Sequence, residues 1–260
     1  MANLKEIRSR ITSVGSTMQI TSAMKMVSAA KLKRAQNAIL EMRPYAEKLT
    51  ELLRNVSLSI DSSEAGVYSQ ERETKKVLLV TITSNRGLCG GFNAYIIKSA
   101  KELINNDYKL AKVDVLSIGK KSSEYFVKNK FSVNSTHDEI FTELTFDNVS
   151  VIAENIMQQF VEGDYDKVVL VYNQFKNAAT QIIMNENYLP VEKVKEEQAV
   201  SGDYLFEPTK EEIVKELIPK SLKTQLFKAV LDSHAAEHGA RMTAMHKATD
   251  NAGELKKELT

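Results

Sequence analysis

The chain has 260 residues, a formal net charge of +1 and one cysteine, Cys89. It contains no apolar run of the roughly eighteen residues that a membrane-spanning helix needs, so we expect no such helix. A single cysteine excludes an internal disulfide and is typical of a reducing compartment. The N-terminus lacks the short apolar core of a secretory signal, and we expect neither a secretory nor a transit peptide.

The charge is unevenly distributed along the chain. Residues 1–54 carry ten Lys/Arg against four Asp/Glu, a net of +6, which leaves −5 for the remaining residues. No acidic residue lies between Glu6 and Glu41. Such a basic end indicates an acidic partner or a solvated helix face. Nucleic acid is a poorer candidate, because this basic window has no interleaved aromatic residues.

A heptad pattern predicts one long N-terminal helix over residues 1–58. Positions spaced three and four apart form a seam, and thirteen of its sixteen members are apolar or alanine: Leu4, Ile7, Ile11, Val14, Met18, Thr21, Lys25, Ser28, Leu32, Ala35, Ile39, Met42, Ala46, Leu49, Leu53 and Val56. A 3.5-residue repeat of this length requires a partner helix. We expect Asn3 as the N-cap and a kink or local fraying at Pro44. Some fifty residues make a rod of roughly 75 Å.

The three polar members of the seam are consecutive. Thr21, Lys25 and Ser28 interrupt the apolar positions near the middle of the helix. From the pattern alone we interpret this polar window as a weak part of the coil.

Residues 61–75 lack periodicity and are expected to form a solvated linker. Short β-rich runs then alternate with helical stretches over residues 76–200, which predicts an inserted three-layer, Rossmann-like α/β domain. The β-branched composition favours buried parallel strands. The expected strands are 77–83, 113–118, 168–172 and 179–188, and the expected helices are 93–105, 120–129 and 148–161. Pro190 and the Glu/Lys-rich residues after it are expected to leave the domain.

A second long helix is predicted over residues 209–260, with Thr209 and Glu212 in the spacing of a capping box. Small side chains form a stripe along this helix: Ala229, Ser233, Ala236, Ala240 and Thr243. Because such a stripe lets another helix approach closely, we expect it to pack on the N-terminal seam. A neighbouring stripe contains Leu231, Ala235, His238, Met242, Met245, Thr249, Ala252 and Leu259. The predicted architecture is α/β: a long antiparallel coiled coil of the terminal helices with the α/β domain inserted between them.

Two motifs suggest chemistry of their own. His234, Glu237 and His238 fit the H-x-x-E-H pattern of a zinc peptidase, but a third protein ligand is required and few residues follow. The glycine-rich stretch Ser84–Asn93 (SNRGLCGGFN) lies between a strand and a helix, where such a loop can hold phosphate. It matches no nucleotide-binding fingerprint, so a tight structural turn is the better interpretation. Cys89 within it has no neighbouring histidine that would favour a nucleophile.

Five segments resemble the γ subunit of F-type ATP synthase, the central rotor shaft, in that family's order. They are Ile7–Gln36, Ser84–Asn93, Val171–Phe175 (VYNQF), Asp203–Pro208 (DYLFEP) and Ala235–Ala252 (AAEHGARMTAMHKATDNA). The resemblance covers essentially the whole chain up to Thr260. The family's closing tail, which forms the tip of the shaft, does not occur within it.

The resemblance implies a non-catalytic subunit that couples rotation of a membrane c-ring, driven by protons or sodium ions, to ATP synthesis or hydrolysis on β subunits. The implied partners are the α and β subunits of the α3β3 ring, the ε subunit and the c-ring. It implies no cofactor, no metal and no nucleic acid. The implied location is peripheral, on the cytoplasmic face of a bacterial cell membrane.

The resemblance also assigns contact residues. Met24, Lys25 and Arg241 match the neck that faces an acidic loop of the β subunit. The polar window from Thr21 to Ser28 coincides with this neck, so the resemblance implies that it is the working surface toward the catalytic ring. The foot that meets the c-ring matches Tyr204, Leu205, Phe206 and Glu207. Two rival functions stay open from the residues alone: a coiled-coil scaffold with a ligand-binding α/β domain, and a metallohydrolase.

Overall fold

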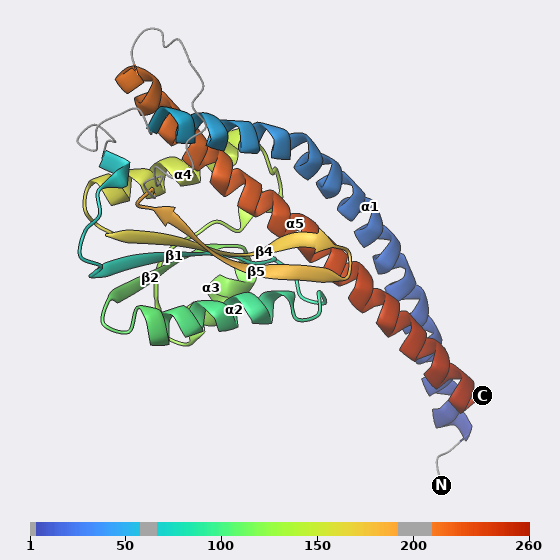
Figure 1. Ribbon diagram of the computed structural model, residues 1–260. Helices are drawn as coiled ribbons and strands as arrows, with labels where there is room; N and C mark the ends of the chain where they lie inside the picture. The colour runs from blue at the N-terminus through green and yellow to red at the C-terminus, as the bar shows by residue number, and fades with distance from the viewer. Residues whose placement is uncertain (1–3, 58–66, 192–209) are drawn as a thin grey trace.

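A computed structural model describes residues 4–57, 67–191 and 210–260 of the chain. Two long helices run antiparallel along one side of an α/β body, and both continue past it, so that the two ends of the chain meet far from the sheet (Figure 1). They are α1 (Leu4–Ser57) and α5 (Lys210–Leu259). None of the described helices combines the length and the apolar character needed to cross a bilayer.

The heptad seam of α1 faces α5. Leu32, Ala35 and Ile39 are buried against Leu231 and Ala235 of α5. Toward the chain ends the seam positions Ile7, Ile11, Val14 and Met18 are partly buried, and Leu4 at the start of α1 is 73% exposed. The predicted coiled coil is therefore confirmed.

Pro44 does not interrupt α1, which is helical from Leu4 to Ser57. The prediction of local fraying there is wrong. Asn3, Thr209 and the Glu/Lys-rich segment after Val191 lie outside the described residues, so the predicted caps and the exit segment stay predictions.

The body contains a five-stranded sheet in the order β3-β2-β1-β4-β5. The first four strands in this order are parallel and β5 is antiparallel to β4. The bounds are β1 Lys76–Ile82, β2 Lys112–Ile118, β3 Ser132–Thr136, β4 Lys167–Asn177 and β5 Thr180–Leu189. The central strands are almost wholly buried, because helices cover both of their faces.

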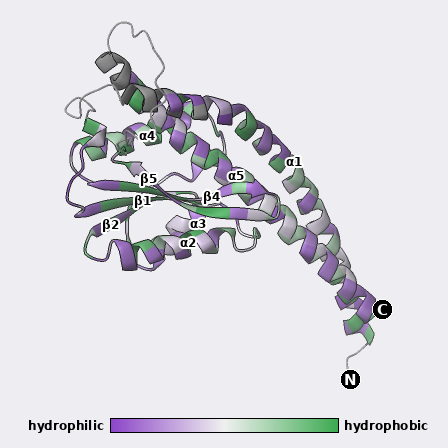
Figure 2. Ribbon diagram, in the orientation of Figure 1, coloured by the Kyte–Doolittle hydropathy of each residue, from purple (hydrophilic) through white to green (hydrophobic). Residues whose placement is uncertain are grey.

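Helices cover the sheet in layers (Figure 1). α2 (Phe92–Glu102), which continues as a π-helical turn over Leu103–Asp107, and α3 (Lys120–Lys128) cover one face. α4 (Phe146–Val161) and the middle of α5 cover the other, and α1 lies outside α5. Two short 3-10 helices, Val67–Ser69 and Glu139–Phe141, complete the described elements. Figure 2 shows hydrophobic segments within the sheet, whereas the end of the rod near the termini is mostly hydrophilic.

The four predicted strands and three predicted body helices are confirmed, with ends shifted by a few residues. β3 was not predicted. Its sequence, Ser-Val-Asn-Ser-Thr, is short and polar because it forms the edge of the sheet and buries little of its surface.

The small-residue stripe of α5 faces the body instead of α1, so that expectation is wrong. Ala229 joins the core of the sheet, Ala236 packs on Cys89 and Phe92, and Thr243 donates a hydrogen bond to the Ala178 carbonyl at 3.1 Å. At Gly239 an added Cβ would lie 3.0 Å from that carbonyl oxygen. The close neighbour that requires small side chains is thus the β4–β5 hairpin, and the neighbouring stripe of Leu231, Ala235 and Met242 packs on α1.

Candidate functional site

The glycine-rich loop Ser84–Asn93 leaves the carboxyl end of β1 and leads into α2. Its two ends are tied together, because the Ser84 amide donates to Asn93 Oδ1 at 2.9 Å and Ser84 Oγ donates to the Arg86 carbonyl at 2.7 Å. Leu88 and Gly90 adopt left-handed backbone conformations, with φ of 63° and 59°. The loop is thus a tight, internally bonded turn, as the residue pattern predicted.

Cys89 lies inside this turn and is only 1% exposed. Asn93 Nδ2 donates to its sulfur at 3.2 Å, and Ser84 Oγ lies 3.7 Å away. Burial raises the pKa of the Cys89 thiol, so the reactive thiolate is disfavoured. Its contacts are those of a packing residue.

Arg241 of α5 reaches into the same loop. Its Nη2 donates to the carbonyls of Arg86 at 3.0 Å and Gly87 at 3.3 Å, and its Nη1 forms an ion pair with Glu237 one turn earlier. The residue is 9% exposed. Burial raises the pKa of Glu237, and the neighbouring guanidinium opposes that change.

α5 covers the position where a domain of this topology would bind a ligand. Such ligands bind beyond the carboxyl ends of the strands, where the connections change direction between two neighbouring strands, here β1 and β4. At that place Ala236 packs on Cys89 and Phe92, and Ser233 Oγ lies 3.5 Å from the Ile82 carbonyl. The geometry therefore argues against the ligand-binding scaffold.

The H-x-x-E-H motif forms no metal-binding arrangement. The rings of His234 and His238 lie 4.5 Å apart, His234 stacks on Phe141, and Glu237 is engaged by Arg241. Burial lowers the pKa of His234 to about 4 and that of His238 to about 3, and the cationic Lys31 and Arg241 contribute in both cases. Within residues 4–57, 67–191 and 210–260, no three His, Cys, Asp or Glu side chains converge as a metal site would require.

The predicted neck residues occupy different environments. Met24 and Lys25 are partly exposed on α1, whereas Arg241 is buried against the chain's own loop. Tyr204, Leu205, Phe206 and Glu207, the predicted foot, lie outside the described residues. A contact of either group with another subunit stays a prediction.

The polar window of the seam faces α5, which corrects its interpretation as a working surface. Thr21 accepts a hydrogen bond from Thr249 Oγ1 at 2.8 Å, and Ser28 Oγ donates to the Met24 carbonyl at 2.8 Å. Both side chains are buried, so their hydroxyl groups serve the coil itself. Only Lys25 of the three remains available to solvent.

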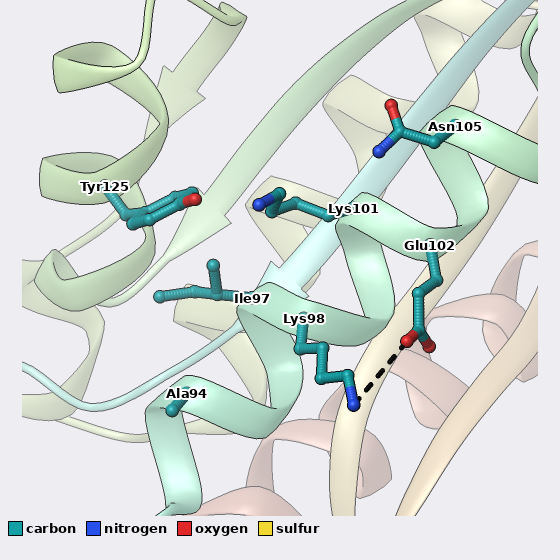
Figure 3. Close-up of a pocket in the computed structure, with 7 residues that line it drawn as sticks. All are labelled: Ala94, Ile97, Lys98, Lys101, Glu102, Asn105 and Tyr125. Carbon is teal, nitrogen blue, oxygen red and sulfur yellow. Dashed lines mark ion pairs between the residues drawn. The ribbon is translucent and has the colours of Figure 1, made fainter.

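An open groove of about 510 Å³ lies between α2 and α3, on the sheet face away from the rod (Figure 3). Lys98 pairs with Glu102 at 3.8 Å, and Lys101 Nζ lies 5.9 Å from the centre of the Tyr125 ring. The side chains of Lys98 and Glu102 are mostly exposed and pair with each other across the surface of α2. The groove therefore offers no candidate catalytic centre.

Fold and site together define a class of protein: an antiparallel two-helix rod carrying an inserted α/β body, whose ligand crevice is closed by the rod itself. The sequence matches the ATP synthase family over residues 3–260. An ATP synthase gamma chain of Flavobacterium johnsoniae is 62% identical over all of this chain and 90% of its own length. One of Christiangramia forsetii is 58% identical with the same coverage. The chain belongs to the family of ATP synthase gamma chains.

Solved structures show the same fold. A central stalk and c-ring structure of Tetrahymena thermophila mitochondrial ATP synthase contains a chain that matches with a TM-score of 0.66 and 28% identity, over 88% of this chain and 99% of that one. The rotor of Euglena gracilis mitochondrial ATP synthase contains a chain that matches with a TM-score of 0.67 and 19% identity, over 98% and 94% of the two chains.

Proposed function

We propose that this chain is the rotor shaft of the F1 sector of an ATP synthase, coupling c-ring rotation to ATP synthesis or hydrolysis on the β subunits. The observation that carries the proposal is the family match over nearly the whole chain, together with a rod that extends well past its body (Figure 1). One charge crossing 100 mV supplies about 2.3 kcal/mol, so several must be combined for each ATP. A packed two-helix rod resists twisting better than a single helix would.

In this function the chain has no catalytic residues of its own. That proposal is supported by the closed crevice between β1 and β4 and by the engagement of Glu237, the base of the H-x-x-E-H motif, with Arg241. Its segments 1–58 and 209–260 would form the shaft, residues 61–75 the linker and residues 76–200 the body. Catalysis would occur on the β subunits, whose conformations the asymmetric shaft changes in turn.

The neck would contact an acidic loop of the β subunit through Met24 and Lys25. Thr21 of α1 faces Thr249 of α5, and Met24 and Lys25, both partly exposed, follow about one turn further along α1. Arg241, the third residue of the proposed neck, is 9% exposed and is bound to the chain's own loop, so it would contribute to this surface from beneath. A cationic surface near acidic loops provides attraction without requiring one fixed binding register.

The same proposal places the foot, Tyr204–Glu207, against the c-ring, and the body beside the ε subunit. The chain would then be a peripheral protein on the cytoplasmic face of a bacterial cell membrane. No cofactor and no nucleic acid take part in this function.

Co-assembly with purified α and β subunits tests the proposal. We expect the chain to form a complex with ATPase activity, and we expect Lys25→Glu to reduce that activity severalfold because it places an acid opposite an acidic loop. The effect should weaken as salt screens the exposed charge. Lys98→Glu is the matched control, since Lys98 lies on α2 away from the rod.

Failure of the wild-type chain to join α and β subunits would contradict the rotor function. Equal effects of the two charge reversals would contradict the neck contact while leaving the rotor function standing.

A further inference from the structure

The connection between rod and body contains a buried charge pair that the packing of the coil does not require. Glu237 and Arg241 lie on the side of α5 that meets the body, and their side chains are each 10% exposed. Arg241 is the member that crosses to the body, through the Arg86 and Gly87 carbonyls. Glu237 neutralises it and holds the guanidinium in place.

The loop that receives Arg241 is itself rigidly held by the body. Asn173 of β4 donates to the Phe92 carbonyl at 3.1 Å. Asn85 Nδ2 donates to the Asp138 carbonyl at 2.7 Å, and Asn85 Oδ1 accepts from the Lys120 amide at 3.0 Å. The loop is thus tied to β4, to the start of α3 and to the segment before α4. A force applied at the loop reaches the whole sheet.

We propose that Arg241, held by Glu237, is a positioning residue that locks the Ser84–Asn93 loop onto α5 and so couples rotation of the body to rotation of the rod. The second half of this proposal, the coupling of the two rotations, rests on the rotor function proposed above. The ligand crevice of the α/β domain is thus occupied by a helix, and two carbonyls of the loop there accept hydrogen bonds from the Arg241 guanidinium. α2 and the hairpin at Ala178 support the same seat on either side.

Cys89 provides a direct probe of the lock. It is the only cysteine of the chain, and its side chain is buried between the loop and Ala236 of α5, so a thiol reagent reaches it only when the loop separates from α5. We expect Glu237→Gln/Arg241→Met to increase the rate of Cys89 labelling by 5,5′-dithiobis(2-nitrobenzoate) about tenfold or more. The double variant removes both charges and leaves no unpaired buried ion, so the fold is retained. Lys247→Gln, an exposed change on the same helix, is the matched control.

Two further measurements separate positioning from general stability. Hydrogen exchange of the Ser84 and Phe92 amides, which are bonded only within the closed loop, should accelerate in the double variant. Exchange of the buried β1 amides should not change. Uniform acceleration of both sets, or unchanged Cys89 labelling, would overturn the lock.

The functional part is tested in the assembled complex. We expect the number of ions transported per ATP hydrolysed to fall in the double variant, because slippage at the joint loses rotation between the rod and the body. If Cys89 of the double variant is labelled rapidly but the assembled complex still transports the wild-type number of ions per ATP, the lock has no role in torque transfer. The labelling experiment needs no partner subunit, so failure of the wild-type chain to assemble would contradict the rotor function alone.

Discussion

At the scale of single residues, the most informative group is the buried polar cluster on α5. His234, Glu237, His238 and Arg241 sit within two turns of one helix, beside Lys31 of α1. In the chain they resemble a metal site. In the fold the Glu237–Arg241 pair reaches the loop, and the two imidazoles pack as neutral rings.

The neutral state of His234 predicts a pH-dependent stability. Its pKa is about 4 in the folded chain and about 6.5 when unfolded, so the unfolded chain binds the extra proton between these values. This stability is fully present above pH 6.5 and is lost as the pH falls toward 4. Between pH 7 and pH 5 the loss should be on the order of 2 kcal/mol. Denaturant titration at both pH values should show a smaller loss for His234→Leu.

Other buried groups also change protonation with pH, so the test compares two proteins that share them. The pKa values of Glu237 and Asp232 are raised by burial, so these carboxyl groups gain stability as the pH falls, opposite to the histidines. They are present in both proteins, so the comparison isolates the contribution of His234. His246→Gln, on the exposed part of α5, serves as the surface control. An equal loss in wild type and His234→Leu would contradict the assignment.

At the scale of elements, the coil between α1 and α5 depends on a narrow seam. Ile39 is 3% exposed and packs toward Leu231 and Ala235, whereas the next residue, Leu40, is 64% exposed. Helical periodicity thus places two similar side chains, one residue apart, in opposite environments.

We expect Ile39→Ala to lower the free energy of unfolding by about 3 kcal/mol, because it removes buried methyl groups and leaves a cavity. Leu40→Ala should change it by less than about 0.5 kcal/mol. Chemical denaturation of the two variants checks both values. Similar losses would show that α1 is not held in this register against α5.

At the scale of the whole molecule, the extended shape follows from helices that continue past the body (Figure 1). A compact chain of 260 residues would have a radius of gyration of about 18 Å. The 54 residues of α1 alone span about 80 Å along the helix. We expect small-angle X-ray scattering of the isolated chain to give a radius clearly above 18 Å and a maximum dimension on the order of 80 Å. A value near 18 Å would contradict the paired rod.

The sequence by itself determined the long helices, the parallel α/β body and the tight turn at Ser84–Asn93. Each of these depends on a local pattern: a heptad repeat, β-branched runs between helices, or glycines at positions needing unusual backbone angles. The family resemblance followed from the same segments, and the comparisons confirmed it.

Only the tertiary structure decided which face of each long helix packs against which neighbouring element. Periodicity identifies the faces of a helix but not their neighbours, so the small-residue stripe of α5 was matched to the wrong partner. The Ala178 backbone approaches Gly239 and Thr243 from more than sixty residues away, a contact that no local pattern encodes. Likewise no local pattern encodes the binding of the Arg241 guanidinium by two carbonyls of a distant loop, while a contact of Arg241 with another subunit stays a prediction.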